Sequence, residues 1–279
     1  MISALAACAG CSSLRALHHA AELCVSVPAP TGDPGIVRFG IIPTRRAPKP
    51  VPYAIVLPRG VEPRRIERVV YVAPGRGGTA EDVVGAMGYA SAAQHIIAAG
   101  APAFALIAMD SGESYYHPRT SGEDRLGILE IDLPALLRTI IAPHLAREAL
   151  IGQSMGGYGA LLAAERNPTR YRAVAVAAPA IFQTFAEEDH AVGDAFDDAT
   201  QFAEYDVLAH AHRLAHTPVL VRVGYNDPFL RSAGAFAAAC PHADVGYVEN
   251  GCHDDGFWRA TASELLTFAV STRVEKIPA

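Results

Sequence analysis

The chain has 279 residues, of which 51% are hydrophobic and 19% are charged, a balance that excludes an intrinsically disordered protein. Five cysteines are too few for a disulfide-dense mini-scaffold, and a net charge of −6 disfavours a nucleic-acid-binding protein, which normally carries a basic patch. The sequence contains no apolar run of 18 residues, so we predict no transmembrane helix.

The first 35 residues differ from the rest of the chain. Leu5–Cys8 resembles a bacterial lipobox, although the residues before it supply neither a basic region nor the apolar stretch of about 7–15 residues that a signal peptide needs. The alternative is a chance match in an alanine-rich stretch, with a short helix at residues 13–23. We expect residues 1–35 to be a leader and linker, the remnant of a lipoprotein-type export segment. On that basis we favour an exported or envelope-associated protein over a cytoplasmic one.

From residue 36, short apolar runs alternate with longer segments of helical pattern. The first two runs are flanked by prolines, which suit edge strands, and we expect them to pair antiparallel. The later alternation is typical of βαβ units and predicts an α/β domain over residues 36–279, with a mostly parallel sheet and helices on both faces. Residues 182–215 break the alternation, being first acidic and then rich in histidine, and we expect this insert to cover one end of the sheet. The predicted strands are 37–42, 53–57, 69–73, 103–109, 149–151, 173–177, 219–223 and 245–248, and the predicted helices are 80–99, 126–145, 155–167, 229–239 and 258–270.

The strand at 149–151 runs directly into the sequence G-Q-S-M-G at residues 152–156, and a predicted helix follows. A G-x-S-x-G pattern between a strand and a helix is typical of a nucleophile elbow, where a serine at the apex of a tight turn is exposed above the sheet. The glycines let neighbouring segments approach closely, and the helix N-terminus favours developing negative charge. We therefore predict Ser154 as a nucleophile, the alternative being a helix N-cap serine.

A serine nucleophile needs a base, and the base needs an acid that orients it. In a nucleophile-elbow fold the chain order is serine, acid, histidine. Asp227 comes directly after the strand at 219–223, and His253 follows the strand at 245–248. We therefore predict a Ser154–His253–Asp227 triad. The competing acids are Asp206, Asp254 and Asp255. The remaining clustered histidines, which no carboxylate or cysteine pattern completes into a metal site, are His210, His212 and His216.

An acyl-transfer site also needs donors for the oxyanion of its tetrahedral intermediate. We expect the backbone N–H of Met155 to be one donor. The second should come from the glycine-rich loop at 74–78, where the N–H of Arg76 is our candidate and its side chain is expected to face substrate. A phosphate-binding loop is the weaker alternative, because neither nucleotide-binding glycine pattern is present.

Five segments together resemble a known family. They are Y-V-A-P-G at 71–75, D-S-G-E-S-Y-Y at 110–116, E-I-D-L-P at 130–134, G-Q-S-M-G-G-Y-G-A at 152–160, and G-C-H with a following F-W at 251–258. They are similar to the esterases of the α/β-hydrolase superfamily, a group that includes esterase D (S-formylglutathione hydrolase), feruloyl esterases and antigen 85 mycolyltransferases. The resemblance spans about residues 37–268. It implies an α/β-hydrolase fold, the same triad, and the amides of Arg76 and Met155 as oxyanion donors. Pro74 stands where the family has a histidine.

Other side chains have two interpretations. Tyr115, Tyr116 and Trp258 could line an acyl or aromatic pocket, although aromatic residues at such positions usually pack in the core. Cys240 and Cys252 flank one strand and could pair in an exported protein, or they could be two buried thiols.

The predicted function is that of a serine esterase that cleaves carboxylic esters through an acyl-enzyme, with a small-molecule ester as substrate and no metal or cofactor. The alternatives are an acyltransferase of the antigen 85 type, which uses a sugar or another alcohol as acceptor, and a non-catalytic binding protein on the same fold. The sequence does not identify the acyl chain, the alcohol or the oligomeric state.

Overall fold

The computed structural model describes residues 24–25, 27–28, 30–142 and 147–271. The lipobox-like segment Leu5–Cys8 and the helix expected at 13–23 lie outside these residues. Of the helices that are described, none is long and apolar enough to cross a bilayer.

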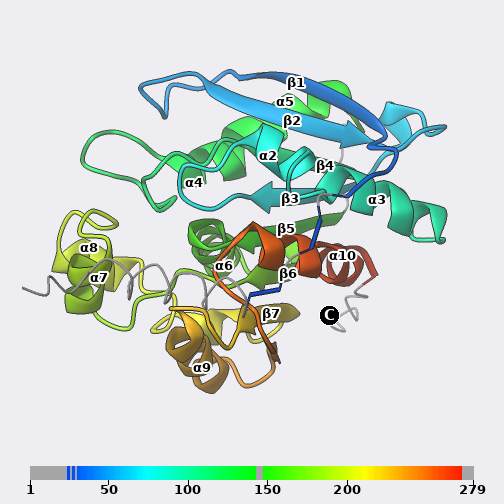
Figure 1. The fold of residues 1–279 in the computed structure, drawn as a ribbon. Helices are drawn as coiled ribbons and strands as arrows, with labels where there is room; N and C mark the ends of the chain where they lie inside the picture. The colour runs from blue at the N-terminus through cyan, green and yellow to red at the C-terminus, as the bar shows by residue number, and fades with distance from the viewer. Residues whose placement is uncertain (1–23, 26, 29, 143–146, 272–279) are drawn as a thin grey trace, which may run out of the picture.

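One eight-stranded sheet with the order β1-β2-β4-β3-β5-β6-β7-β8 forms the centre of the molecule (Figure 1). β2 pairs antiparallel with β1 and with β4, and every pair from β4 to β8 is parallel. The expected antiparallel pair at the N-terminal edge and the mostly parallel sheet are both confirmed. The strands are β1 (Ile36–Ile42), β2 (Val51–Leu57), β3 (Arg68–Ala73), β4 (Ala105–Met109), β5 (Arg147–Gln153), β6 (Tyr171–Ala177), β7 (Val219–Gly224) and β8 (Asp244–Val248).

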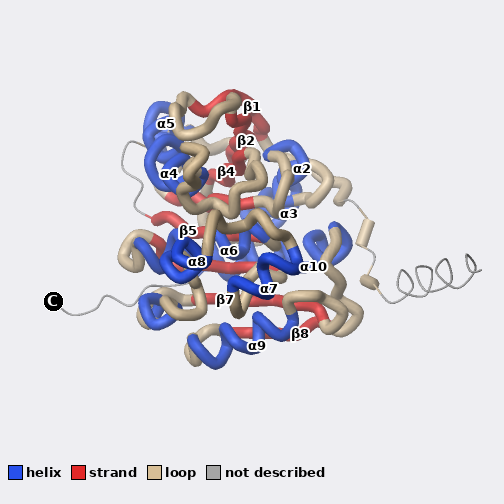
Figure 2. The backbone as a smooth tube through the Cα atoms, turned by 90° about the vertical axis from the view of Figure 1, so that its left-hand side faces the viewer, coloured by secondary structure: helices blue, strands red, loops and turns tan. Residues whose placement is uncertain are grey.

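Helices cover both faces of the sheet, and the view in Figure 2 separates the two layers. On one face, α10 packs on β3, β5 and β6 and also on α3, while α2 packs on β2 and β4. On the other face, α6 packs on β3, β5 and β6, and α9 packs on β7 and β8. The helices are α2 (Ala80–Val84), α3 (Tyr89–Ala98), α4 (Arg125–Gly127), α5 (Leu133–Ile140), α6 (Met155–Arg166), α7 (Phe185–Ala191), α8 (Ala199–Glu204), α9 (Leu230–Ala239) and α10 (Asp255–Ser271), with short helical turns η1 (Pro63–Arg65), η2 (Ile128–Asp132) and η3 (Ala211–Leu214).

The central strands are buried from both sides, which explains their continuous apolar runs. All five residues of β4 are buried, as are Val69 to Ala73 of β3. Parallel sheets covered by helices on both faces have this composition, because neither face of the strand meets water. The carboxyl ends of β3, β5, β6, β7 and β8 consequently meet at one edge of the sheet, where ligand sites of open α/β folds form.

Two predicted helices are shorter than expected. The single helix predicted at 80–99 is wrong, because the chain breaks between α2 and α3 at Gly85 and at Gly88, whose φ of +77° is left-handed. The helix predicted at 126–145 starts as α4, passes through one π-helical turn, η2, and ends as α5 at Ile140. Pro134 is the second residue of α5; it has no N–H to donate to the preceding turn, which is the π-helical turn η2.

The insert at 182–215 carries α7, α8 and η3 and lies at the carboxyl edge of the sheet (Figures 1 and 2). His117 connects it to the rest of the domain. The imidazole is stacked between the rings of Phe196 and Tyr205, at 4.7 and 4.9 Å, and its Nε2 lies 2.8 Å from the carbonyl oxygen of Ala195. Burial lowers the pKa of His117 to about 4, so the ring is neutral at pH 7.

Candidate active site

Ser154 sits in a strained backbone turn between β5 and α6. Its φ of 52° and ψ of −123° are sparsely populated by residues other than glycine. Neighbouring hydrogen bonds hold the turn: Ser154 N donates to Ala177 O at 3.0 Å, and Ser154 O accepts from Ala180 N at 2.9 Å. Gly156 lies so close to the carbonyl of Ala73 that no Cβ would fit. The sequence folds here as the G-x-S-x-G pattern predicts.

Ser154, His253 and Asp227 come together in a line of hydrogen-bonded side chains. His253 Nε2 lies 2.8 Å from Ser154 Oγ, and His253 Nδ1 lies 2.9 Å from Asp227 Oδ2. A carboxylate can only accept, so Nδ1 carries the proton and donates it to Asp227, which leaves the Nε2 lone pair to accept from the serine hydroxyl. The Asp227 side chain is fully buried, whereas 24% of the His253 side chain is exposed.

The loops that carry Asp227 and His253 are joined by their backbones. Asn226 N donates to Gly251 O at 3.0 Å, and Gly224 lies against Gly251 too closely for a Cβ on either residue. Asp227 is fixed in turn, because its Oδ1 accepts from Phe229 N at 2.8 Å. Glycine at 251 therefore allows the β7 and β8 loops to meet, which sets the separation between the acid and the histidine.

The competing acids and histidines lie elsewhere or have structural partners. Asp254 Oδ1 accepts from Phe257 N at 2.9 Å at the start of α10, and Asp206 Oδ1 accepts from Leu208 N at 2.8 Å. The carboxylate of Asp255 is 3.9 Å from Arg259. His212 and His216 are exposed and His210 is half-buried, all three in or beside η3 at the end of the insert.

The glycine-rich loop after β3, in which we predicted the second oxyanion donor, lies against Ser154. A Cβ on Gly75 would be 3.3 Å from Ser154 Cβ. Buried Ser111 fastens this loop, because its hydroxyl lies 2.6 Å from Gly75 O and its N–H donates to Gly78 O at 3.1 Å. Met155 is the first residue of α6, where backbone N–H groups have no partner inside the helix.

The side chain of Arg76 differs from our expectation. It is not free to face substrate, because its Nη2 pairs with Asp194 of the insert at 2.8 Å and with Glu113 at 3.4 Å. Both carboxylates are exposed; the pair with Asp194 attaches the loop to the insert, and the pair with Glu113 attaches it to the segment after β4. The oxyanion role of the Arg76 backbone N–H stays a prediction.

A cavity of about 430 Å³ opens at Ser154 and His253. Trp258 lines it and packs edge-on against the His253 ring at 5.0 Å, while Phe229 contacts the same ring from 5.3 Å. The other residues that line the cavity are Gly75, Arg76, Gly77, Gly78, Asp82, Ala86, Met87, Asp254 and Asp255.

Tyr115 and Tyr116 do not line this cavity. Tyr115 is 3% exposed and packs on Tyr158 and Phe182, and Tyr116 is fully buried against Gly159 of α6. Both have left-handed backbone conformations, with φ of 52° and 63°, which turn the two side chains into the core. Of the three aromatic residues proposed for a pocket, only Trp258 reaches it.

The cysteine pairing also differs from our expectation. Cys252 is bonded to Cys24, and Cys240 is a buried free thiol, so the proposed Cys240–Cys252 pair is wrong. The bond attaches a segment directly beside His253; its described residues, 24–25, 27–28 and 30–33, are called the strap. Among the described residues, the one grouping of potential metal ligands is Cys24, Cys252 and Asp254, and its two sulfur atoms are used by the disulfide.

Three contributors to the site were missed by sequence reasoning: Cys24, Ser111 and Phe229. Ser111 follows β4 at the carboxyl edge of the sheet, and Phe229 follows the predicted acid by two residues, so their position in the chain was an available signal. Cys24 gave none, because nothing local relates it to a loop 228 residues away.

Comparison with known proteins places the chain in a family. A family model described as "Putative esterase" matches residues 45–261. The S-formylglutathione hydrolase of Mus musculus is 28% identical over 125 residues, which are 42% of this chain and 44% of the mouse protein. The match thus spans less than half the length of the curated relatives.

Solved structures agree with this assignment at the level of the fold. A ferulic acid esterase has a TM-score of 0.73 at 17% identity, over 85% of this chain and 98% of the esterase. The S-formylglutathione hydrolase from Agrobacterium tumefaciens has a TM-score of 0.73 at 18% identity, over 88% and 98%. The fold is that of the α/β hydrolases, and the chain belongs to the Esterase family.

Proposed function

We propose that this protein is a serine hydrolase of carboxylic esters, with Ser154 as nucleophile, His253 as base and Asp227 as the orienting acid. The observation that carries the proposal is the continuous chain of two hydrogen bonds, 2.8 and 2.9 Å long, from the hydroxyl to the buried carboxylate. Membership of the Esterase family supports the same reaction class.

The first half of the reaction follows from these contacts. Ser154 Oγ attacks the ester carbonyl while His253 Nε2 accepts its proton, and the buried carboxylate of Asp227 stabilises the imidazolium. The oxyanion accepts hydrogen bonds from the backbone N–H groups of Met155 and Arg76. His253 then gives the proton to the leaving alcohol, and the acyl group stays on Ser154.

Deacylation repeats these steps with a second nucleophile. Water enters the cavity, His253 Nε2 takes one proton from it, and the hydroxide attacks the acyl-enzyme. Collapse of the second tetrahedral intermediate returns the proton to Ser154 and releases the acid. An alcohol in place of water would give a transesterified product, which is the reaction of an acyltransferase.

Labelling with a fluorophosphonate tests the nucleophile directly, because the probe forms a covalent bond only with an activated serine. We expect the probe to label wild type and the control variant Ser121→Ala, which changes an exposed serine. The variants Ser154→Ala and His253→Ala should lose both labelling and hydrolysis of p-nitrophenyl acetate. Labelling of Ser154→Ala at the wild-type rate would refute the proposed nucleophile.

A second measurement separates hydrolysis from acyl transfer. The products of p-nitrophenyl butyrate are quantified with and without about 0.5 M glucose, which competes with water as the acyl acceptor. We expect free butyrate as the main product in both. A butyryl sugar as the main product would replace the hydrolase with a transferase.

A further inference from the structure

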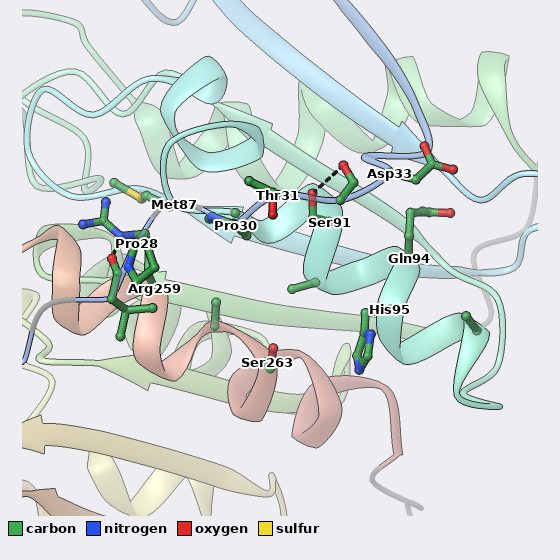
Figure 3. Close-up of a pocket in the computed structure, with 16 residues that line it drawn as sticks. Pro28, Pro30, Thr31, Asp33, Met87, Ser91, Gln94, His95, Arg259 and Ser263 are labelled. Carbon is green, nitrogen blue, oxygen red and sulfur yellow. Dashed lines mark hydrogen bonds between the residues drawn. The ribbon is translucent and has the colours of Figure 1, made fainter.

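A second cavity, of about 540 Å³, lies next to the active-site cavity (Figure 3). The strap forms one wall, and α3 and α10 form the others. Figure 3 shows Met87, Pro28 and Arg259 at one end, Gln94 and His95 at the other, and Ser263 between them, so the cavity runs along the two helices. Met87 lines this cavity and the one at Ser154 as well, which makes the two neighbours.

The strap is held against the helices by specific bonds. Arg259 Nε donates to Val27 O at 2.7 Å, and Ser91 Oγ donates to Gly32 O at 3.3 Å. Asp33 pairs with Arg59 at 2.7 Å, and the Cys24–Cys252 bond fixes the other end of the strap. The wall is therefore built by hydrogen bonds, an ion pair and a covalent bond, and the cavity exists before any ligand enters.

The lining of the cavity suits a neutral, slender ligand. Small side chains on the two helices, among them Ala92, Ala98 and Ala262, leave the space, and Val27, Pro28 and Met87 add apolar surface. Polar side chains are interspersed with these, namely Thr31, Ser91, Gln94, His95 and Ser263. The two charged residues in the wall are already paired: Arg259 with backbone carbonyls and Asp33 with Arg59. Neither is available to hold an ionic ligand.

We infer that this cavity, here called the strap cavity, binds an unbranched aliphatic chain of the ester whose carbonyl lies at Ser154. This inference rests on the proposed esterase function and names its substrate class: esters with a medium-length alkyl chain. To reach the strap cavity from Ser154, the chain passes between Met87 and the guanidinium of Arg259, which bridges Val27 O and Ala86 O, and then continues between α3 and α10. Cavities of several hundred Å³ with mainly apolar walls are the usual size and character of small-ligand sites.

Two isomeric esters test the inference and assign the chain to the acyl or the alcohol side. Methyl octanoate has its alkyl chain on the acid, and heptyl acetate has it on the alcohol; ethyl acetate is the short reference. Each methylene that enters the strap cavity is expected to raise kcat/KM by up to about fourfold, from the free energy of burying one methylene. We expect one isomer to exceed ethyl acetate by at least about 100-fold.

Filling the strap cavity should remove this preference. We compare kcat/KM for the long ester with kcat/KM for ethyl acetate. Two variants, Ala92→Phe on α3 and Ser263→Phe on α10, are expected to lower this ratio by at least about tenfold, because the phenyl ring takes the place of several methylenes. Thr267→Phe, exposed one turn further along α10 and outside the cavity, should keep the wild-type ratio. Equal turnover of all three esters by wild type, or an unchanged ratio in both filling variants, would overturn the inference.

A binding measurement tests the strap cavity independently of the proposed catalytic role of Ser154. Calorimetric titration of Ser154→Ala with the preferred long ester measures binding without turnover. We expect saturable binding that Ser263→Phe abolishes in the double variant. If Ser154→Ala binds the ester and also hydrolyses it at the wild-type rate, the proposed nucleophile alone is refuted. If Ser154→Ala does not bind the ester while wild type hydrolyses it normally, the proposed role of the strap cavity alone is refuted.

Discussion

Asp227 is bonded through both of its carboxylate oxygens, Oδ2 to His253 Nδ1 at 2.9 Å and Oδ1 to the N–H of Phe229 at 2.8 Å. The carboxylate therefore has a fixed orientation, and its hydrogen bond to Nδ1 orients the histidine ring. The proton on Nδ1 is what leaves Nε2 free to accept from Ser154. This pair decides which tautomer of His253 is present, and the first prediction follows from it.

Asp227→Asn is expected to lower kcat by about 1,000- to 10,000-fold with little change in the fold. The amide oxygen can still accept from Phe229 N, but the amide NH₂ would donate to Nδ1 and force the proton onto Nε2, which then cannot accept from Ser154. Steady-state kinetics on p-nitrophenyl acetate measures the loss, and thermal unfolding is the control. A variant with more than one tenth of wild-type kcat would show that Asp227 does not orient the base.

Arg76 offers a matched pair of variants that separates backbone from side chain. Arg76→Ala keeps the N–H, and the ion pairs it loses are exposed and each contribute about 0–1 kcal/mol, so kcat should stay within about threefold of wild type. Arg76→Pro removes the N–H and should lower kcat by about 100- to 1,000-fold. Fluorophosphonate labelling checks that the Pro variant keeps an ordered Ser154. Equal losses of kcat in both variants would show that the guanidinium, and not the backbone N–H, contributes to catalysis.

Loss of the Cys24–Cys252 bond is expected to affect stability and catalysis together. Cys24→Ser/Cys252→Ser should lose about 2–4 kcal/mol of unfolding free energy. Its kcat/KM should also fall, because the strap no longer anchors the residue before His253. Dithiothreitol should bring wild type to the level of the double variant. Cys240→Ala, at the buried free thiol, should remain as sensitive to dithiothreitol as wild type. A reductant effect that is equally large in the double variant would point to a different target.

His117 is expected to make the protein less stable in mild acid. Its pKa is lowered to about 4 in the fold by burial, against about 6.5 in the unfolded chain, so the unfolded state binds the proton first. Stability should therefore fall as pH drops from about 6.5 to about 4, by up to about 3 kcal/mol, and His117 should add no further loss below that range.

The matched variant is His117→Gln, which keeps a hydrogen-bond donor and does not titrate. Urea unfolding at pH 4.5 and pH 7 should show a smaller difference for this variant than for wild type. Asp197, whose pKa is lowered to about 2, acts in more acidic solution and does not overlap this window. The same pH dependence in both proteins would show that another group is responsible.

The parts of the fold that depend on short stretches of sequence could be predicted. Apolar runs located all eight strands, and in the central parallel strands the runs are continuous because a buried parallel strand must be apolar on both faces. Ser154 was identifiable because its turn requires glycines within two positions of it. Asp227 and His253 were identifiable by their place after two strands, since parallel strands bring their carboxyl ends to one edge.

The features that were missed or wrong depend on distant contacts. Cys24 and Cys252 are 228 residues apart, and no local pattern distinguishes Cys252 from Cys240 as the partner. Whether Tyr115 and Tyr116 enter the core or the cavity is decided by two left-handed backbone conformations that their side chains do not favour. The ion pairs of Arg76 depend on how the insert folds back, which charge patterning alone does not determine.

The position of the Cys24–Cys252 bond has a consequence for the order in which the molecule is assembled. A chain made from its N-terminus exposes Cys24 early, but Cys252 follows only after all eight strands and every described helix except α10 have been synthesised. The sheet and the elbow at Ser154 can therefore form first. The Cys24–Cys252 bond forms last, and His253 reaches its final position only then. The nascent chain therefore folds before it becomes active.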